Sequence, residues 1–299
     1  MALGYTLPSA VLVTSLFILR SYSLELNVSQ AQAPTPDHDL VEFLQNFEYL
    51  GADQFFLHGA TGRGLDAIAP ELNQGGPPPL GGKLAALDPF TKDVILQFAW
   101  QKRVVDCPRP LLNISKQLFA EFANQAAGQT LSPPFDPYAN TLNFLLASYG
   151  ISEFAPPGYV RISPHLQNAT LKTLVAGLLG VEFGQQAVIR AYLYERRNFL
   201  VFPYPVTVAE FTNSLSELGN RLGKEGTKSE GLVVPPSEGA EGKVSGNVLS
   251  ADNDSLSYAK EPAAIVRVAY GRGNEAVPGG FFPRGANGRI ARSFLTAAP

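Results

Sequence analysis

Two glutamates, Glu48 and Glu182, lie on the apolar sides of predicted helices. Glu182 is four residues after Leu178 and seven before Ile189, and Glu48 has the same relation to apolar residues of its own segment. Residues at these spacings share one face of a helix. A carboxylate on a buried face is costly unless it is neutralised, paired or bound to a metal ion. The alternative is that each glutamate lies at the edge of the apolar face and reaches water or a neighbouring donor. The presence of two such glutamates in one chain makes this alternative weaker.

Inward carboxylates on two helices suggest the chemistry of a di-iron or di-manganese centre. In a helical bundle such a centre takes a Glu from each of two helices and a Glu-x-x-His from each of the other two. The residue three after Glu182 is Gln185, a neutral amide, so the pattern is incomplete. A single weakly held ion, or a proton shared between Glu48 and Glu182, is the remaining alternative.

Four long apolar patterns at helical spacing are available to position these side chains. They cover residues 39–58, 89–105, 138–151 and 171–197. We therefore predict an all-α fold, a four-helix bundle of the ferritin-like kind over residues 39–206. Residues 207–299 form a predicted irregular, partly helical C-terminal extension that packs on the bundle. It contains a capping box at Thr207 and Glu210 and a last helix over 263–270.

Prolines and N-capping residues mark the predicted helix ends. Asp88 is a predicted N-cap because Pro89 follows it at the first helical position. A shorter helix is expected over residues 111–127. The run Pro156-Pro157-Gly158 is expected to end the third bundle helix and to open a loop.

The start of the chain differs from the rest. An apolar run over residues 7–19, followed by Arg20 and small residues, predicts a signal peptide over residues 1–23. An uncleaved anchor is the alternative, but the run is shorter than the ~20 residues that a membrane span needs. After signal removal we expect no integral membrane span. Residues 24–38 form a predicted disordered leader.

Four acceptor sequons agree with export and predict a glycoprotein. Their asparagines are Asn27, Asn113, Asn168 and Asn253. The sequence has one cysteine, Cys107, so an intrachain disulfide is excluded.

The composition is that of a globular protein. Hydrophobic residues make up 45% and charged residues 16% of the chain, and the net charge is -3. A nucleic-acid partner is not expected from this charge. The sequence has no Gly-x-Ser-x-Gly motif, no phosphate-binding glycine loop and no Cys/His zinc pattern.

Six stretches of the sequence have a distinctive text: residues 46–50, 70–79, 131–140, 175–182, 207–213 and 277–281. They resemble the plant desiccation-related proteins of the ferritin-like superfamily, and the resemblance runs from about Asp39 to the end of the chain. It implies a ferritin-like bundle with a family-specific C-terminal part, in secreted proteins linked to dehydration stress.

The metal ligands that the resemblance implies carry over only in part. Glu48 matches the glutamate of the first helix, and Glu182 matches that of the last. The family's second helix continues with a Glu-x-x-His where this chain, after Gln101, has neither residue. Gln185 stands where the pattern needs a histidine, and Gln186 where relatives are expected to have an acid. Glu48, Glu182 and Gln185 are therefore predicted to be vestigial metal ligands, and no catalytic residue is assigned.

The resulting hypothesis is a secreted, non-catalytic, protective protein of water stress, located in the apoplast or cell wall. No cofactor is expected. The alternative is a ferritin-like oxidoreductase or metal-binding protein that holds iron or manganese. A third hypothesis is a cell-wall or lipid-associated binding module. The expected partners are the cell wall or further copies of the same chain.

Overall fold

The computed structural model describes residues 35–101, 107–239, 242–252 and 254–296, without the side chains of 52–54. The predicted signal peptide, most of the leader and the sequons at Asn27 and Asn253 lie outside these residues. Residues 35–299 are assigned to one compact unit. In the described part of the chain, no helix is both long enough and apolar enough to cross a membrane.

Helices make up the regular structure of the described residues, and β-pairing is limited to isolated bridges, which confirms the all-α prediction. The helices are α1 (Asp37–Glu48), α2 (Leu57–Thr61), α3 (Leu65–Ile68), α4 (Pro89–Trp100), α5 (Lys116–Ala127), α6 (Thr141–Ile151), α7 (Ala155–Ile162), α8 (Ala169–Glu195), α9 (Val208–Gly223), α10 (Pro262–Ala269) and α11 (Arg289–Thr296). Three further segments are the π-helix η1 (Tyr49–Phe56) and the 3₁₀-helices η2 (Pro70–Asn73) and η3 (Ser163–His165).

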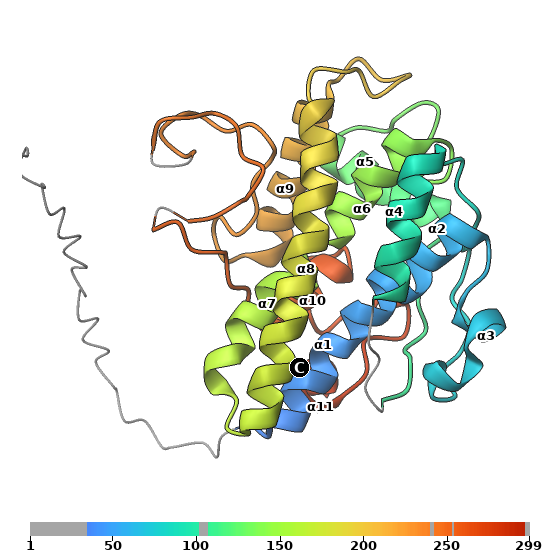
Figure 1. The fold of residues 1–299 in the computed structure, drawn as a ribbon, viewed down its shortest axis with the longest axis vertical. Helices are drawn as coiled ribbons and strands as arrows, with labels where there is room; N and C mark the ends of the chain where they lie inside the picture. Colours follow the sequence, from blue (N-terminus) through green and yellow to red (C-terminus); the bar gives the residue numbers. More distant parts are fainter. Residues whose placement is uncertain (1–34, 102–106, 240–241, 253, 297–299) are drawn as a thin grey trace, which may run out of the picture. The chain divides into compact units, whose positions relative to one another are not determined.

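The bundle is built from the continuous rod α1–η1–α2, from α4, from α6 with α7, and from α8 (Figure 1). The rod contacts α4, α6 and α7, while α8 packs against α6 and α7. Aromatic rings fill the space between these elements: Phe55 of η1 stacks on Phe144 of α6, with ring centroids 4.6 Å apart. The segment η1, which follows Glu48, is therefore packed in the core of the bundle.

Two helix starts have the capping contacts that the sequence predicts. The Asp88 carboxylate accepts from the backbone N–H of Thr91 at 2.9 Å, and Pro89 follows it in the first turn of α4. At the start of α9, Thr207 and Glu210 form a reciprocal capping box. Each contact satisfies backbone donors that a helix leaves unpaired in its first turn.

The first predicted helix is wrong in its second half. The α-helix ends at Glu48, and eight residues in π-helical conformation follow before α2. A π-helix is rare and is frequently found at functional sites, and no simple apolar period predicts it. The predicted helix at 111–127 is also too long, because α5 begins only after its N-cap Ser115. Before that residue the chain is extended, and Asn113 forms a parallel bridge with Leu80.

The prediction that Pro156-Pro157-Gly158 opens a loop is wrong. These residues lie inside α7, whose first turn accepts prolines because its N–H groups have no helical partner. Gly158 is needed there, since an added Cβ would lie 2.4 Å from Leu44 of α1. The helix α11, which the sequence analysis also missed, packs on α1.

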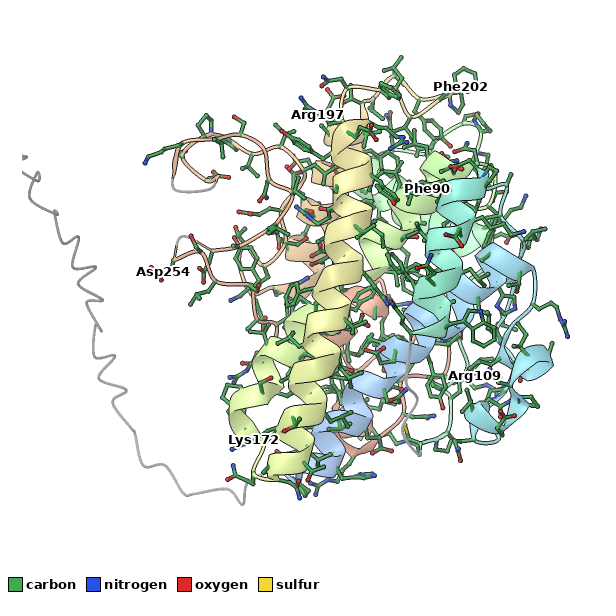
Figure 2. All side chains as sticks on the ribbon, in the orientation of Figure 1. Phe90, Arg109, Lys172, Arg197, Phe202 and Asp254 are labelled. Atoms are coloured by element: carbon green, nitrogen blue, oxygen red, sulfur yellow. The ribbon has the colours of Figure 1, made fainter. Side chains whose placement is uncertain are left out.

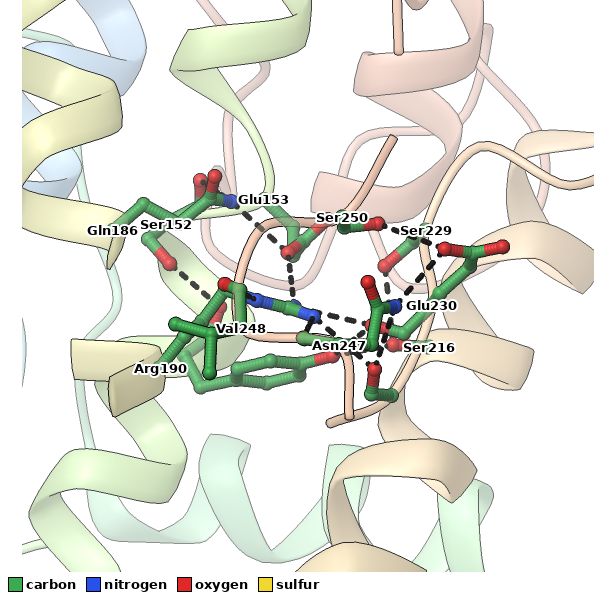
Figure 3. Close-up of polar contacts among 12 residues, drawn as sticks. Ser152, Glu153, Gln186, Arg190, Ser216, Ser229, Glu230, Asn247, Val248 and Ser250 are labelled. Atoms are coloured by element: carbon green, nitrogen blue, oxygen red, sulfur yellow. Dashed lines mark hydrogen bonds and ion pairs between the residues drawn. The ribbon is translucent and has the colours of Figure 1, made fainter. Parts of the chain in front are cut away.

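The C-terminal extension is joined to α8 through Arg190, which is 1% exposed (Figure 3). Its guanidinium donates to four backbone carbonyls, those of Glu230, Gly231, Asn247 and Val248, at 2.7–3.1 Å. It also lies 3.6 Å from the carboxylate of Glu153 and over the ring of Tyr149. One buried cation on α8 thus orders two irregular segments of the extension.

Candidate functional site

Glu48 occupies the junction between α1 and the π-helical segment η1. Its side chain is 1% exposed, and its Oε1 accepts a hydrogen bond from the hydroxyl of Tyr159 on α7 at 2.8 Å. The phenol is itself buried. A carboxylate in this position needs such donors, because burial without them costs several kcal/mol.

Glu182 of α8 approaches the same tyrosine. Burial raises the pKa of Tyr159 well above its usual value, and the charges of Glu48 and Glu182 raise it further. Glu182 is buried as well, as the apolar spacing around it predicts. The fold therefore gathers two carboxylates from α1 and α8 around a neutral phenol from α7. We call Glu48, Tyr159 and Glu182 the carboxylate centre.

The two glutamines that follow Glu182 are directed to other parts of the bundle. Gln185 donates from its amide to Oε1 of Gln101, beyond the end of α4, at 3.3 Å. Gln186 donates to the carbonyl of Ser152 and to the carboxylate of Glu153. Both amides are buried and act as donors between helices, a task that requires neither charge nor a metal ion.

The side chains near the carboxylate centre do not fit a di-metal site of the ferritin-like type. That site requires four glutamates and two histidines, from four helices. The acid of α4 is Asp93, which is exposed and bonded to Gln97, and α6 contains neither acid nor histidine. Among the described residues, the fold thus brings two carboxylates, a phenol and an amide to this part of the bundle, whereas the di-metal pattern has six ligand side chains.

The histidines lie elsewhere in the described structure. His38 and His165 are exposed, and His58 is in α2, ten residues beyond Glu48. His38, Asp39 and Glu42 are close enough to hold an ion, but they lie at the outer end of α1. Asp39 is also paired with Arg289 of α11. This cluster is therefore distinct from the carboxylate centre.

The sequence analysis missed Tyr159, because it treated the two prolines before it as the end of a helix. The signal was present: prolines in a first turn, followed by Tyr159 and Ile162 three residues apart, predict a short amphipathic helix. Both side chains are buried. The hydrogen bond to Glu48, 111 residues away in sequence, could not have been predicted from spacing.

Two of the predicted glycosylation asparagines are in the described residues. Asn168 is exposed and caps α8 through its Oδ1, which accepts from Thr170 and Leu171. Asn113 is half-buried, and its backbone N–H donates to Phe281. Asn168 is thus the more accessible of these two acceptors.

The comparisons with known proteins agree with the helical architecture. Residues 36–195 match the model of the ferritin-like domain. The chain is 52% identical over 268 residues to the ferritin-like catalase Nec2 of Nesocodon mauritianus, covering 87% of this chain and 86% of that protein. It is 46% identical over 265 residues to the desiccation-related protein PCC13-62 of Craterostigma plantagineum, covering 86% and 84%. No solved structure matches.

Proposed function

Because the chain belongs to the ferritin-like domain family and is related to a desiccation-related protein, we propose that it is a secreted protective protein of water stress without metal-dependent catalysis. The observation that carries the proposal is the composition of the carboxylate centre. Two glutamates and a tyrosine stand in a bundle whose metal-binding relatives need four glutamates and two histidines.

The carboxylate centre can stabilise the bundle through a hydrogen bond, without a bound metal ion. The Tyr159 hydroxyl stays protonated because burial and two nearby carboxylates all raise its pKa, so it remains a donor to Glu48. A hydrogen bond from a neutral donor to a carboxylate contributes about 1.5–3 kcal/mol. It links α1 to α7 in the interior of the bundle, where a metal ion would otherwise link helices.

A metal-dependent oxidoreductase is the second candidate. It is favoured by the 52% identity to a relative named as a catalase. In that case Glu48 and Glu182 would be metal ligands. The remaining ligands would have to be side chains other than the glutamates and histidines of the usual bundle pattern. The two candidates differ in metal stoichiometry and in hydrogen peroxide consumption.

The test loads the purified full chain with Fe²⁺ or Mn²⁺, removes free ions and measures bound metal and peroxide consumption. The variant is Glu48→Gln with Glu182→Gln, and the matched control is Asp93→Asn, which alters an exposed acid of α4. We expect well under one ion per chain and no peroxide consumption in all three proteins. Stoichiometric metal and activity that disappear in the double variant alone would overturn the proposal.

Export is supported by the apolar run at residues 7–19 and by the sequons. The substitution Thr170→Ala removes the sequon at Asn168, and the asparagine that caps α8 stays in place. In plant cell culture we expect the wild type in the medium and the variant lighter by one N-glycan. Retention of the wild type inside the cells, or equal masses after export, would contradict this part of the proposal.

A further inference from the structure

A groove outside the carboxylate centre lies where α5, the segment 133–143 and the turn 199–206 meet. Its volume is about 740 Å³, within the roughly 300–1,000 Å³ of small-molecule sites. Glu48, Tyr159 and Glu182 do not line it. We propose that this groove binds a neutral oligosaccharide.

Three asparagines in the wall of the groove are held rigidly by one amide atom each. Asn124 accepts through Oδ1 from the N–H of Leu131 at 2.8 Å, and Asn140 accepts through Oδ1 from the N–H of Asn143 at 2.8 Å. Asn143 donates from Nδ2 to the carbonyl of Asp136 at 2.9 Å. Since a backbone N–H can only donate and a carbonyl can only accept, these bonds define which way each amide faces.

The second amide atom of each asparagine is available to a ligand. No described residue bonds to Nδ2 of Asn124 or of Asn140, or to Oδ1 of Asn143. Asn143 is 6% exposed, and no described residue donates to its side-chain carbonyl oxygen. This oxygen can accept a hydrogen bond from water or from a ligand hydroxyl. The groove thus presents two fixed donors and one fixed acceptor, and sugar hydroxyls can satisfy both kinds.

The charges around the groove favour a neutral ligand. Lys116 and Asp136 lie opposite each other with 3.6 Å between Nζ and Oδ2, so their charges compensate. Glu121, also in the wall, is exposed and leaves the groove slightly negative. An acidic polymer or a phosphate would be repelled there, whereas a polyhydroxyl ligand would not.

An aromatic side chain stands at the rim of the groove, near the outer end of α8 (Figure 2). Phe202 is 82% exposed, while its neighbours Val201 and Tyr204 are buried and hold the turn in place. The Tyr204 hydroxyl donates to the carbonyl of Pro133 at 2.8 Å, which ties the turn to the opposite wall. An exposed ring on a rigid turn offers an apolar face on which the C–H face of a pyranose can stack.

The binding experiment uses isothermal titration calorimetry on the purified full chain. The probes are two neutral hexasaccharides, cellohexaose and xylohexaose, with an oligogalacturonate of the same length as the acidic probe and a decaproline peptide as the protein-like probe. We expect saturable binding of at least one neutral hexasaccharide and weaker binding of the other two probes.

Two variants with matched controls locate the binding to the groove. Phe202→Ala removes the exposed ring, and Phe199→Ala removes a ring of similar exposure, 62%, that does not line the groove. Asn124→Asp keeps the bond from Leu131 but turns the Nδ2 donor into an acceptor, and Gln125→Glu makes the same change at an exposed neighbour outside the groove. We expect about fivefold or greater weakening from Phe202→Ala and Asn124→Asp, and less than about twofold from the controls.

Several outcomes would overturn this site. They are the absence of neutral hexasaccharide binding at millimolar concentration, preference for the acidic or peptide probe, and equal effects of the groove variants and their controls. Circular dichroism of each variant separates lost binding from lost folding, and Phe202→Ala carries the test if Asn124→Asp is unfolded. The result is independent of the metal and peroxide measurements, because no residue of the carboxylate centre is altered.

Discussion

Arg190 and Glu182 are two buried charged residues on the same helix, eight residues apart, and their described surroundings differ. Arg190 is surrounded by acceptors: four backbone carbonyls and the carboxylate of Glu153 (Figure 3). Glu182 shares the neighbourhood of Tyr159 with Glu48, a charge of its own sign. The surroundings of Arg190 are complementary to its charge, whereas those of Glu182 include a second carboxylate and a buried phenol.

The difference shows what each region contributes. A buried cation with a full set of acceptors orders the chain around it, and its removal takes a donor from each of those acceptors. Two buried carboxylates near one phenol repel each other unless a proton or a cation lies between them. Arg190 therefore has the character of a structural residue, whereas the carboxylate centre gathers acidic side chains around one phenol.

The substitution Arg190→Ala should have the largest effect. It takes one donor from each of four backbone carbonyls and removes the cation beside Glu153, so we expect a loss of about 3–5 kcal/mol in the free energy of unfolding. Urea unfolding at neutral pH measures the loss. Arg196→Ala, which removes a more exposed cation paired with Glu195, is the control and should cost less than about 1 kcal/mol. Equal losses would break the comparison between the two regions.

The substitution Tyr159→Phe tests the carboxylate centre directly. It removes the hydroxyl that donates to Glu48 and keeps the ring, so we expect a loss of about 1–3 kcal/mol in the free energy of unfolding. Chemical unfolding of Tyr159→Phe and of Tyr192→Phe, a less buried phenol on α8, provides the measurement and its control. No loss would mean that Glu48 is satisfied by other groups.

Glu275 forms an ion pair with Arg267, and the strength of this pair depends on the protonation of Glu275. The hydrogen bonds from Arg267 lower its pKa from 4.5 to about 2. Because the folded-state pKa lies below the unfolded value, the pair stabilises the protein above pH 4.5, and this contribution disappears as the pH falls toward 2. Relative to Glu275→Gln, we expect an advantage of about 1–2 kcal/mol at pH 7 that falls by more than half at pH 3.

Parallel unfolding curves of the wild type and Glu275→Gln at pH 7, 4.5 and 3 check this dependence. The exposed residue Glu217, substituted in the same way, should show no comparable change with pH. A difference that stays constant between pH 7 and pH 3 would show that the charge of Glu275 does not contribute.

The substitution Glu182→Gln should have the smallest effect. A neutral amide of nearly the same shape preserves packing, keeps a side-chain oxygen that can accept hydrogen bonds and removes one of two neighbouring carboxylate charges, so the free energy of unfolding should change by less than about 1 kcal/mol. Thermal unfolding with and without added Mn²⁺ measures it. A larger loss that depends on Mn²⁺ would show that Glu182 is a working ligand.

Much of the helical architecture could be predicted from local signals. The period of apolar residues predicts α1, α4, α6 and α8, and the Asp88-Pro89 pair and the Thr207–Glu210 box predict two helix starts that the structure confirms. These signals work because they depend on neighbours within a few residues. The π-helical segment after Glu48 has no such local signal. The helix α7 has one, prolines in a first turn followed by Tyr159 and Ile162, but two prolines before a glycine are easily mistaken for a loop.

The sequence by itself determined which ligands are present: Glu48 and Glu182 are glutamates, and Gln185 is a neutral amide where the pattern needs a histidine. It also determined that both glutamates are on apolar faces, because helical spacing follows from chain geometry alone. Only the tertiary structure decided that Tyr159 supplies the hydrogen bond to Glu48 and that Arg190 holds the extension. These contacts join residues forty or more positions apart, and packing alone brings such residues within hydrogen-bonding distance.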